Sequence, residues 1–320
     1  MDVLASESTY KDQRAMTLQT DQIAAQFLPH IGAKMCSLVH RPTGMELLVQ
    51  RPWDHYRVAP YDGDYVAQGE CSGLDDMFPT IDRCCYDRYP WLGTPIPDHG
   101  EVWSIPWEYA VEGERLYCAV HGVRFPYRLE KWISFSAPGV LRTDYRLTNF
   151  SSFDFDFLWA AHPMFVLEEG AEVTLPTSVR QVCTVISLSA ELGRYGDRFD
   201  WPLAKLTNGL TRDLSRMRPK SAHDAAKFYV VGKLQEGWCS LSYPKSRLIL
   251  TLRFPVEQVP YLGILPNEGG FQDLYNVFLE PATASFDRPD VARLHGELST
   301  VGARSTYEWY LELALAGDER

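Results

Sequence analysis

The chain has 320 residues, of which 45% are hydrophobic and 23% are charged, which is the composition of an ordinary soluble globular protein. Its 31 basic and 42 acidic residues give a formal net charge of −11, which argues against a nucleic-acid or anionic-membrane partner and mildly against a polyanionic substrate. All-β and barrel folds often exceed the usual domain size as one unit, so we expect residues 1–320 to form a single domain.

The cysteines and the N-terminal sequence indicate a reducing compartment. There are 7 cysteines, an odd number, and no two of them are spaced as a CxxC pair, which is not the pattern of a disulfide framework or a zinc site. Residues 1–7 lack the basic and apolar regions of a signal peptide. No apolar run reaches the roughly 18 residues that a membrane span requires. We therefore expect a cytoplasmic protein with no membrane partner.

The first fifty residues predict strands connected by tight turns. Residues 1–15 are polar, and we expect a loose lead-in or a short edge strand there. Residues 17–19 and 23–28 flank a Thr-Asp-Gln turn and predict a hairpin. Residues 31–39 predict a further strand, and residues 46–48 follow it after a Pro-Thr-Gly turn.

Residues 50–100 are rich in Pro, Gly, Asp and Tyr and predict a long irregular segment. Such a segment inside a compact domain is more often functional than accidental. It contains the sequence Ser72-Gly73-Leu74-Asp75-Asp76-Met77-Phe78-Pro79, in which two adjacent carboxylates are able to accept hydrogen bonds from hydroxyl groups. The alternative is a solvated turn that caps a helix.

From residue 109 onward, short apolar or alternating runs are separated by turn signals. The predicted strands are residues 109–111, 115–123, 127–135, 140–147, 173–175, 179–187, 227–233, 239–243, 247–254, 261–265 and 307–315. Residues 190–225 are polar and predict only short helical turns. Many short strands with hardly any long amphipathic helix predict an all-β sandwich or barrel.

One strand stands out because it ends in a histidine followed by a proline. The apolar residues Phe153, Phe155, Phe157, Trp159 and Ala161 alternate along it, which places them on one face and His162 on the other. Proline cannot donate a hydrogen bond to a neighbouring strand, so regular pairing should stop at residue 163. His162 is therefore a candidate functional group at the rim of a sheet. The alternative is a core histidine that donates to a backbone carbonyl.

Three short motifs, taken in order, resemble those of the galactose mutarotase-like superfamily, which contains aldose 1-epimerases and hexose-6-phosphate mutarotases. They are His99-Gly100, the sequence His162-Pro163-Met164-Phe165, and Glu280-Pro281. The resemblance extends from residue 18 to residue 315. It implies a large antiparallel β-sandwich and an enzyme that interconverts the α and β anomers of a free aldose.

The reaction that this resemblance implies needs two proton transfers at one end of a pyranose ring. A base removes the proton of the anomeric hydroxyl while an acid protonates the ring oxygen, and no metal or other cofactor is required. The resemblance assigns Glu280 as the base, His162 as the acid and His99 as a second imidazole. Glu280 follows the apolar residues 275–279, so burial is expected to raise its pKa. The alternatives are a strand-end ion pair for Glu280 and a turn histidine bonded to Asp98 for His99.

The residues expected to bind the sugar are Asp75, Asp76 and Trp103. The segment 72–79 resembles a loop that lines the sugar site of hexose-6-phosphate mutarotases, with Asp75 in place of a proline. Trp103 stands where those enzymes carry an arginine, which favours a neutral monosaccharide over a sugar phosphate. Asp98, His99 and Glu101 form a weak candidate trio of metal ligands, and no metal is expected.

Two other functions are compatible with the same sequence. One is a catalytically silent carbohydrate-binding or sensor module. The other is lyase chemistry on a uronate, for which Arg83, Arg88 or Arg124 would have to stabilise the substrate carboxylate. In each case we expect a small monosaccharide as the ligand and a monomeric or homodimeric protein.

Overall fold

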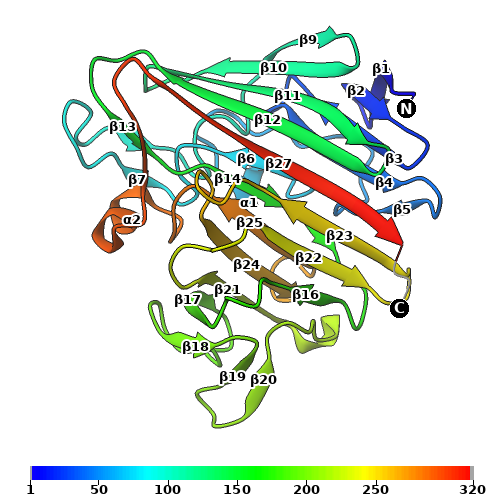
Figure 1. Cartoon of the computed structure of the whole chain (residues 1–320), viewed down its shortest axis with the longest axis vertical. Coiled ribbons are helices and arrows are strands. Elements are labelled where there is room, and N and C mark those ends of the chain that lie inside the picture. The colour runs from blue at the N-terminus through cyan, green and yellow to red at the C-terminus, as the bar shows by residue number, and fades with distance from the viewer. Residues whose placement is uncertain (1, 318–320) are drawn as a thin grey trace.

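Two large antiparallel sheets dominate the structure, a computed structural model that describes residues 2–317 (Figure 1). The thirteen-stranded sheet runs in the order β1-β2-β3-β4-β6-β14-β25-β24-β21-β17-β18, with β5 beside β4 and β15 beside β25. Its strands are β1 (Leu4–Tyr10), β2 (Gln13–Gln19), β3 (Ile23–Leu28), β4 (Lys34–His40), β5 (Met45–Glu46), β6 (Leu74–Met77), β14 (Ala160–Pro163), β15 (Phe165–Val166), β17 (Gln181–Ser187), β18 (Arg198–Asp200), β21 (Asp224–Val230), β24 (Tyr261–Glu268) and β25 (Tyr275–Ala282).

The eight-stranded sheet runs in the order β16-β22-β23-β27-β12-β11-β10-β9. Its strands are β9 (Glu108–Glu112), β10 (Arg115–His121), β11 (Tyr127–Ala137), β12 (Val140–Asn149), β16 (Glu172–Thr174), β22 (Trp238–Tyr243), β23 (Leu248–Arg253) and β27 (Thr306–Gly317). Three two-stranded sheets complete the strands: β7 (Cys84–Cys85) with β8 (Pro95–Ile96), β13 (Phe155–Phe157) with β26 (Ser299–Val301), and β19 (Leu203–Lys205) with β20 (Thr211–Asp213). The helical segments are α1 (Tyr65–Gln68), the 3-10 turn η1 (Lys220–Ala222) and α2 (Pro289–His295).

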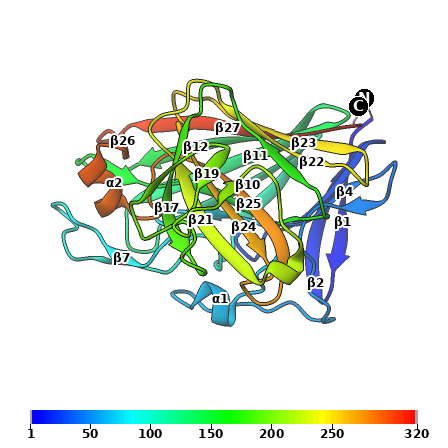
Figure 2. The ribbon, with the colours of Figure 1, turned by 90° about the horizontal axis from the view of Figure 1, so that it is seen from below.

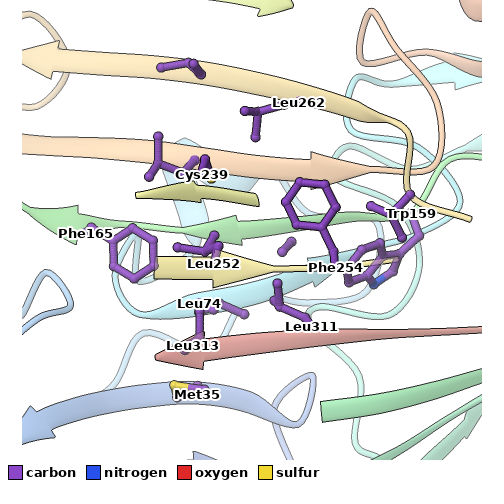
Figure 3. Packing of buried hydrophobic residues seen from close by; sticks show 14 of the residues in the cluster. Met35, Leu74, Trp159, Phe165, Cys239, Leu252, Phe254, Leu262, Leu311 and Leu313 are labelled. Atoms are coloured by element: carbon purple, nitrogen blue, oxygen red, sulfur yellow. The ribbon is translucent and has the colours of Figure 1, made fainter. Parts of the chain in front are cut away.

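The main hydrophobic core lies between the two sheets. Figure 3 shows Trp159 and Phe165 from the thirteen-stranded sheet side packed against Leu252, Leu311 and Leu313 from the other sheet. Strands β11, β12 and β27 alternate between buried and more exposed residues, as expected for a sheet with one solvated face. Strands β24 and β25 are buried along almost their whole length. A second layer therefore covers the outer face of the thirteen-stranded sheet.

That covering layer is built mainly from the loop-rich segment 50–100. In Figure 2, α1 and β7 lie on the side of β21, β24 and β25 that faces away from β27 and β12. A second apolar cluster forms there, in which Tyr65 and Trp103 pack against Ala160, Met164 and Phe278 of the sheet. The long irregular segment thus encloses a space above the sheet.

The predicted all-β sandwich is confirmed, and most predicted strands are present. Of the two alternatives for residues 1–15, the structure shows the edge strand and not the loose lead-in: β1 and β2 pair in continuous antiparallel register from Leu4↔Gln19 to Tyr10↔Gln13, with β1 at the edge of the sheet. Their polar composition reflects the partly exposed edge position. Strands β18, β19 and β20 fall in residues 190–225, where only helical turns were expected. The described part of the chain has no helix long and apolar enough to cross a membrane.

The strand that ends in His162 has the predicted two faces from Phe155 onward, but Phe153 lies before β13 and is 42% exposed, so it does not share the buried face. Phe155, Phe157, Trp159 and Ala161 belong to the core between the sheets, whereas Leu158 and Ala160 belong to the outer apolar cluster. The run is divided into β13, β14 and β15, and β14 ends at Pro163 as expected. Beside β25, β14 pairs only at Ala160↔Ala282, and pairing resumes with β15 at Phe165↔Val277. His162 therefore lies where the ladder to β25 is interrupted.

Candidate active site

A cavity of about 550 Å³ lies between the outer face of the thirteen-stranded sheet and the loops that cover it. Its floor is formed by side chains of neighbouring strands, including His162 of β14, Phe278 of β25, Leu265 of β24 and Lys227 of β21. Its wall comes from α1, from residues 81–83 and 98–99 and from the β24–β25 turn. The predicted residues His99 and His162 both line it.

His162, on the floor of this cavity, contacts Glu280, which lies behind it. His162 Nε2 lies 3.5 Å from Glu280 Oε1, and the two side chains are 6% and 0% exposed. Glu280 lies directly behind the cavity lining formed by His162 and Lys227. Both Glu280 Oε1 and His162 Nδ1 are buried and lack a hydrogen-bond partner among the described residues. Buried polar atoms are nearly always satisfied, so both atoms have hydrogen-bonding capacity that the protein itself does not use.

A buried lysine pairs with Glu280 from the other side. Lys227 Nζ lies 2.7 Å from Glu280 Oε2 and 2.7 Å from Asp287 Oδ1, and all three side chains are at most 3% exposed. Tyr229 donates its hydroxyl to the same Asp287 oxygen at 2.7 Å. One ammonium group thus neutralises part of the charge of two carboxylates. This arrangement orients Glu280 and keeps its carboxylate fixed without access to bulk water.

His99 approaches His162 from the covering loop. The two imidazole rings are 5.2 Å apart between centroids and nearly perpendicular. His99 is stacked on Tyr65 at 4.1 Å, and its Nδ1 lies 3.0 Å from Asp98 Oδ1. The turn-histidine contact with Asp98 is therefore present in addition to the place of His99 in the cavity wall. Its backbone has a φ of 58°, a conformation that is uncommon for residues other than glycine.

The electrostatic environment shifts the proton affinities of Glu280 and His162 in opposite directions. Burial raises the pKa of Glu280, and the Lys227 ammonium opposes this rise. Burial lowers the pKa of His162 well below its usual value, and the neighbouring His99 and Lys227 lower it further. The ordinary gap between the pKa values of a carboxylic acid and an imidazolium therefore narrows. A narrower gap makes it easier for one proton to reside on either member of the pair.

Asp75 and Asp76 do not line the cavity, although sugar binding was expected of them. Asp75 is covered by Tyr65, whose hydroxyl donates to Asp75 Oδ2 at 2.8 Å, and the same oxygen accepts from Lys34 at 2.9 Å. Asp76 faces the main core, where Lys131 donates to it at 2.7 Å and Trp159 at 3.0 Å. Both residues are 1% exposed. They form buried ion pairs that hold the sheet beneath the site.

Trp103 also lies behind the cavity wall and is 5% exposed. Its indole packs edge-on against Tyr65 and donates to the carbonyl oxygen of Asp98 at 2.9 Å, so it supports the wall rather than presenting a free ring face. Gly100 has a structural role as well. A Cβ atom there would lie 2.1 Å from the carbonyl oxygen of Phe78, and φ is 81°, so glycine allows this loop to pack on Phe78.

Of the three arginines considered as partners for a substrate carboxylate, one lines the cavity and two do not. Arg83 lines the cavity and is paired with Asp62 at 2.8 Å. Arg88 and Arg124 do not line it, and they pair with Asp156 and Asp62. Glu101 of the candidate metal trio points away from Asp98 and accepts hydrogen bonds from Tyr61 and Tyr127. Within residues 2–317, no group of three or more His, Cys, Asp or Glu side chains is arranged to hold a metal ion.

Sequence reasoning missed the importance of Lys227, Asp287 and Tyr65. Lys227 carried a signal, because it is a charged residue within the otherwise apolar run Ala225–Val230. A lysine in a strand that is buried on both faces needs a partner carboxylate. Asp287 and Tyr65 lie in loops with no periodic pattern, and nothing in their local sequence marks them.

The sequence matches no protein-family model and no curated protein. Solved structures, in contrast, resemble it along almost its full length. A galactose mutarotase-like protein from Clostridium acetobutylicum is 12% identical with a TM-score of 0.68, over 99% of this chain and 99% of that one. Another from Lactobacillus casei is 18% identical with a TM-score of 0.62, over 94% and 100% of the two chains.

A protein from Klebsiella pneumoniae that is provisionally called an aldose 1-epimerase is 13% identical with a TM-score of 0.71, over 99% of this chain and 85% of that one. At these low identities the likeness is one of fold. It extends over both sheets and the covering loops, since nearly the whole chain is aligned. The chain therefore has the fold of the galactose mutarotase-like proteins.

Proposed function

We propose that this protein is an aldose 1-epimerase-like enzyme that interconverts the α and β anomers of a free aldose by general acid–base catalysis. The observation that carries the proposal is the contact of 3.5 Å between Nε2 of His162, which lines the cavity, and Oε1 of Glu280 directly behind it, with Glu280 Oε1 left without a hydrogen-bond partner. Catalytic hydrogen bonds are often long before substrate binds and tighten in the complex. The provisional and mutarotase-like names of the structural neighbours support the same reaction.

In the proposed reaction, Glu280 accepts the proton of the anomeric hydroxyl while His162 donates a proton to the ring oxygen. The bond between the anomeric carbon and the ring oxygen breaks, and the aldehyde that forms rotates. The ring then closes on the other face of the aldehyde, and each residue takes the opposite role. The pair begins and ends with one shared proton, so the converging pKa values of Glu280 and His162 suit both directions. His99 adds a third polar group beside the ring oxygen.

The charges of the lining favour an uncharged sugar. The cavity is lined by the carboxylates of Asp64, Asp82, Asp98 and Asp287 against the cations Arg83 and Lys227. Lys227 is already shared between two carboxylates, and Arg83 is paired with Asp62. A phosphate dianion would meet uncompensated negative charge, whereas sugar hydroxyls are able to donate to the carboxylates. We therefore expect kcat/KM to be higher for glucose and galactose than for their 6-phosphates.

Polarimetry on freshly dissolved α-glucose and α-galactose tests the proposal directly. His162→Asn and Glu280→Gln should each reduce the mutarotation rate about 10²- to 10⁴-fold without loss of the folded state. The double variant should lose little more than the stronger single variant, because the two residues act as a unit. Circular dichroism and thermal unfolding of each variant serve as the folding control. Unchanged rates in both single variants would contradict the proposal.

A catalytically silent sugar-binding module is the second candidate, and one observation favours it. Glu280 is 0% exposed and does not line the cavity, so a sugar bound there would have to displace the lining before it reached the carboxylate. The two functions are separated by measuring binding and turnover on the same sugars. Saturation-transfer NMR signals from a sugar whose mutarotation the wild-type protein does not accelerate would support the silent module.

A further inference from the structure

The cavity has two chemically different halves. Next to His99 and Lys227 it is lined by charged groups, among them Asp82, Asp98 and Asp287. Near the β24–β25 turn its lining is apolar, and we call this part the apolar arm, which is formed by Val66, Met164, Leu265, Phe271, Leu274 and Phe278. Phe278 begins this arm at the floor, because its ring centroid lies 4.5 Å from that of His162.

The polar side chains next to the apolar arm, Asn267 and Gln272, already have hydrogen-bond partners within the protein. Asn267 donates to the carbonyl oxygen of Phe271 and to Asn276 Oδ1, and its own oxygen accepts from the Phe271 backbone at 2.8 Å. Gln272 donates to the Val66 carbonyl oxygen and accepts from Arg51. A ligand hydroxyl in this arm would lose its hydrogen bonds to water and find no ready replacement. An alkyl group would instead gain from contact with the aliphatic and aromatic walls.

The proton-transfer geometry determines which part of a sugar reaches the apolar arm. In a pyranose the ring oxygen is bonded to the anomeric carbon on one side and to C5 on the other. If Glu280 accepts the proton of the anomeric hydroxyl and His162 donates a proton to the ring oxygen, C5 and its substituent lie on the side of His162. Phe278 contacts that imidazole, and Leu265 lies next to Phe278 as its partner in the β24–β25 ladder. The substituent at C5 is therefore directed into the apolar arm.

We propose that the substrate is a deoxy aldose whose C5 carries a methyl group, that is, a 6-deoxyhexose rather than a hexose with a free hydroxymethyl group. This inference rests on the proposed function, because the roles of Glu280 and His162 orient the sugar. It adds a substrate class that neither the motifs nor the structural neighbours specify. One hydroxyl distinguishes the two sugars, and a hydrophobic pocket discriminates against such an addition by about 10- to 100-fold.

Matched sugar pairs test the proposal. We expect kcat/KM for mutarotation of 6-deoxyglucose and 6-deoxygalactose to exceed that of glucose and galactose by about 10-fold or more. In Leu265→Gln, an amide that is able to bond a hydroxyl replaces an apolar wall, and the preference should shrink or reverse. Val66→Gln is the second variant. Val66 is 53% exposed, so this substitution leaves the fold intact even if Leu265→Gln does not. Equal or better use of the 6-hydroxy sugars by wild-type protein would overturn the inference while leaving the mutarotase proposal in place.

Binding measurements separate this inference from the reaction itself. Saturation-transfer NMR on Glu280→Gln compares the same sugar pairs without turnover, and the 6-deoxy sugars should give the stronger signals, with the methyl protons closest to protein. If wild-type protein accelerates neither member of a pair but binds the 6-deoxy sugar more tightly, the mutarotase proposal fails and the substrate class stands. If neither sugar binds, both are overturned.

Discussion

Replacing Lys227 with methionine should destabilise the protein and shift the pH dependence of its activity, because it removes the cation that pairs with Glu280. The ammonium lies 2.7 Å from oxygens of both Glu280 and Asp287, which at an effective dielectric constant of about 20 is an attraction of about 6 kcal/mol per contact before desolvation is subtracted. Removing one partner of a buried ion pair typically costs about 3–5 kcal/mol. For a domain of this size, that cost corresponds to a fall of about 4–7 °C in the thermal midpoint at neutral pH.

The stability lost in Lys227→Met should depend on pH, because the carboxylates of Glu280 and Asp287 then have no cation between them. Without Lys227 the folded-state pKa of Glu280 rises further above its unfolded value, because burial and Asp287 both disfavour the charged form. A carboxyl group with a raised pKa stabilises the fold below its unfolded pKa, and this contribution is lost as pH rises through the folded pKa. The difference in thermal midpoint between wild type and Lys227→Met should therefore be small near pH 4.5 and large near pH 8. The fall of kcat/KM on the acid side of its maximum, which we call the acid limb, reports the protonation of Glu280. This limb should move to higher pH in Lys227→Met, because the pKa of Glu280 is raised.

Thermal unfolding and polarimetry over the same pH range measure both effects, with Lys131→Met as the control. Lys131 is an equally buried lysine that lies 2.7 Å from Asp76, outside the cavity lining. Its replacement should cost comparable stability but leave the acid limb of kcat/KM in place. Asp287→Asn in the Lys227→Met background should restore part of the stability, because it removes the like charge. An unchanged acid limb in Lys227→Met would refute the reasoning, and so would a pH-independent loss of stability.

Three further predictions concern the site and the loops around it. Because burial lowers the pKa of His162, its protonated form should be lost on the acid side of neutrality, so kcat/KM of the wild type should be higher in mildly acidic solution than at pH 8; a plateau that extends through pH 8 in polarimetry would contradict this. Gly100→Ala should destabilise the protein by more than about 1 kcal/mol in chemical unfolding, because its Cβ would lie 2.1 Å from a backbone oxygen. Gly44→Ala, where φ is 71° and no atom lies within 4 Å, should cost less. Asp76→Asn should lower the thermal midpoint, because it breaks the buried pair with Lys131, yet leave KM for the sugar unchanged; a selective rise in KM would indicate contact with the ligand.

Several features of the site could be predicted from the sequence because they depend on local spacing. Alternation along residues 155–161 placed the apolar side chains in the core between the sheets and His162 on the opposite face. Pro163 marked the end of β14. The segment from Tyr275 to Glu280 is apolar enough to predict a buried carboxylate, and Glu280 is 0% exposed.

The partners of the buried charges were not predictable in this way. Asp75 and Asp76 are adjacent in β6, and their side chains point to opposite faces, so one meets Lys34 of β4 and the other meets Lys131 of the facing sheet. Loop-rich surroundings suggested that both were accessible, but Tyr65 and Trp159 cover them. Trp103 was expected to offer a ring face, and it instead packs behind Tyr65.

The sequence by itself determined the fold class, the faces on which residues 155–162 lie and the burial of Glu280, because these follow from short-range periodicity and local hydrophobicity. Only the tertiary structure decided which charges meet. Lys227 of β21 reaches Glu280 of β25 across the intervening strand β24, and Asp287 joins them from a loop. Pairing between distant segments depends on sheet order and on how loops fold over the sheet, and neither leaves a periodic trace in the chain.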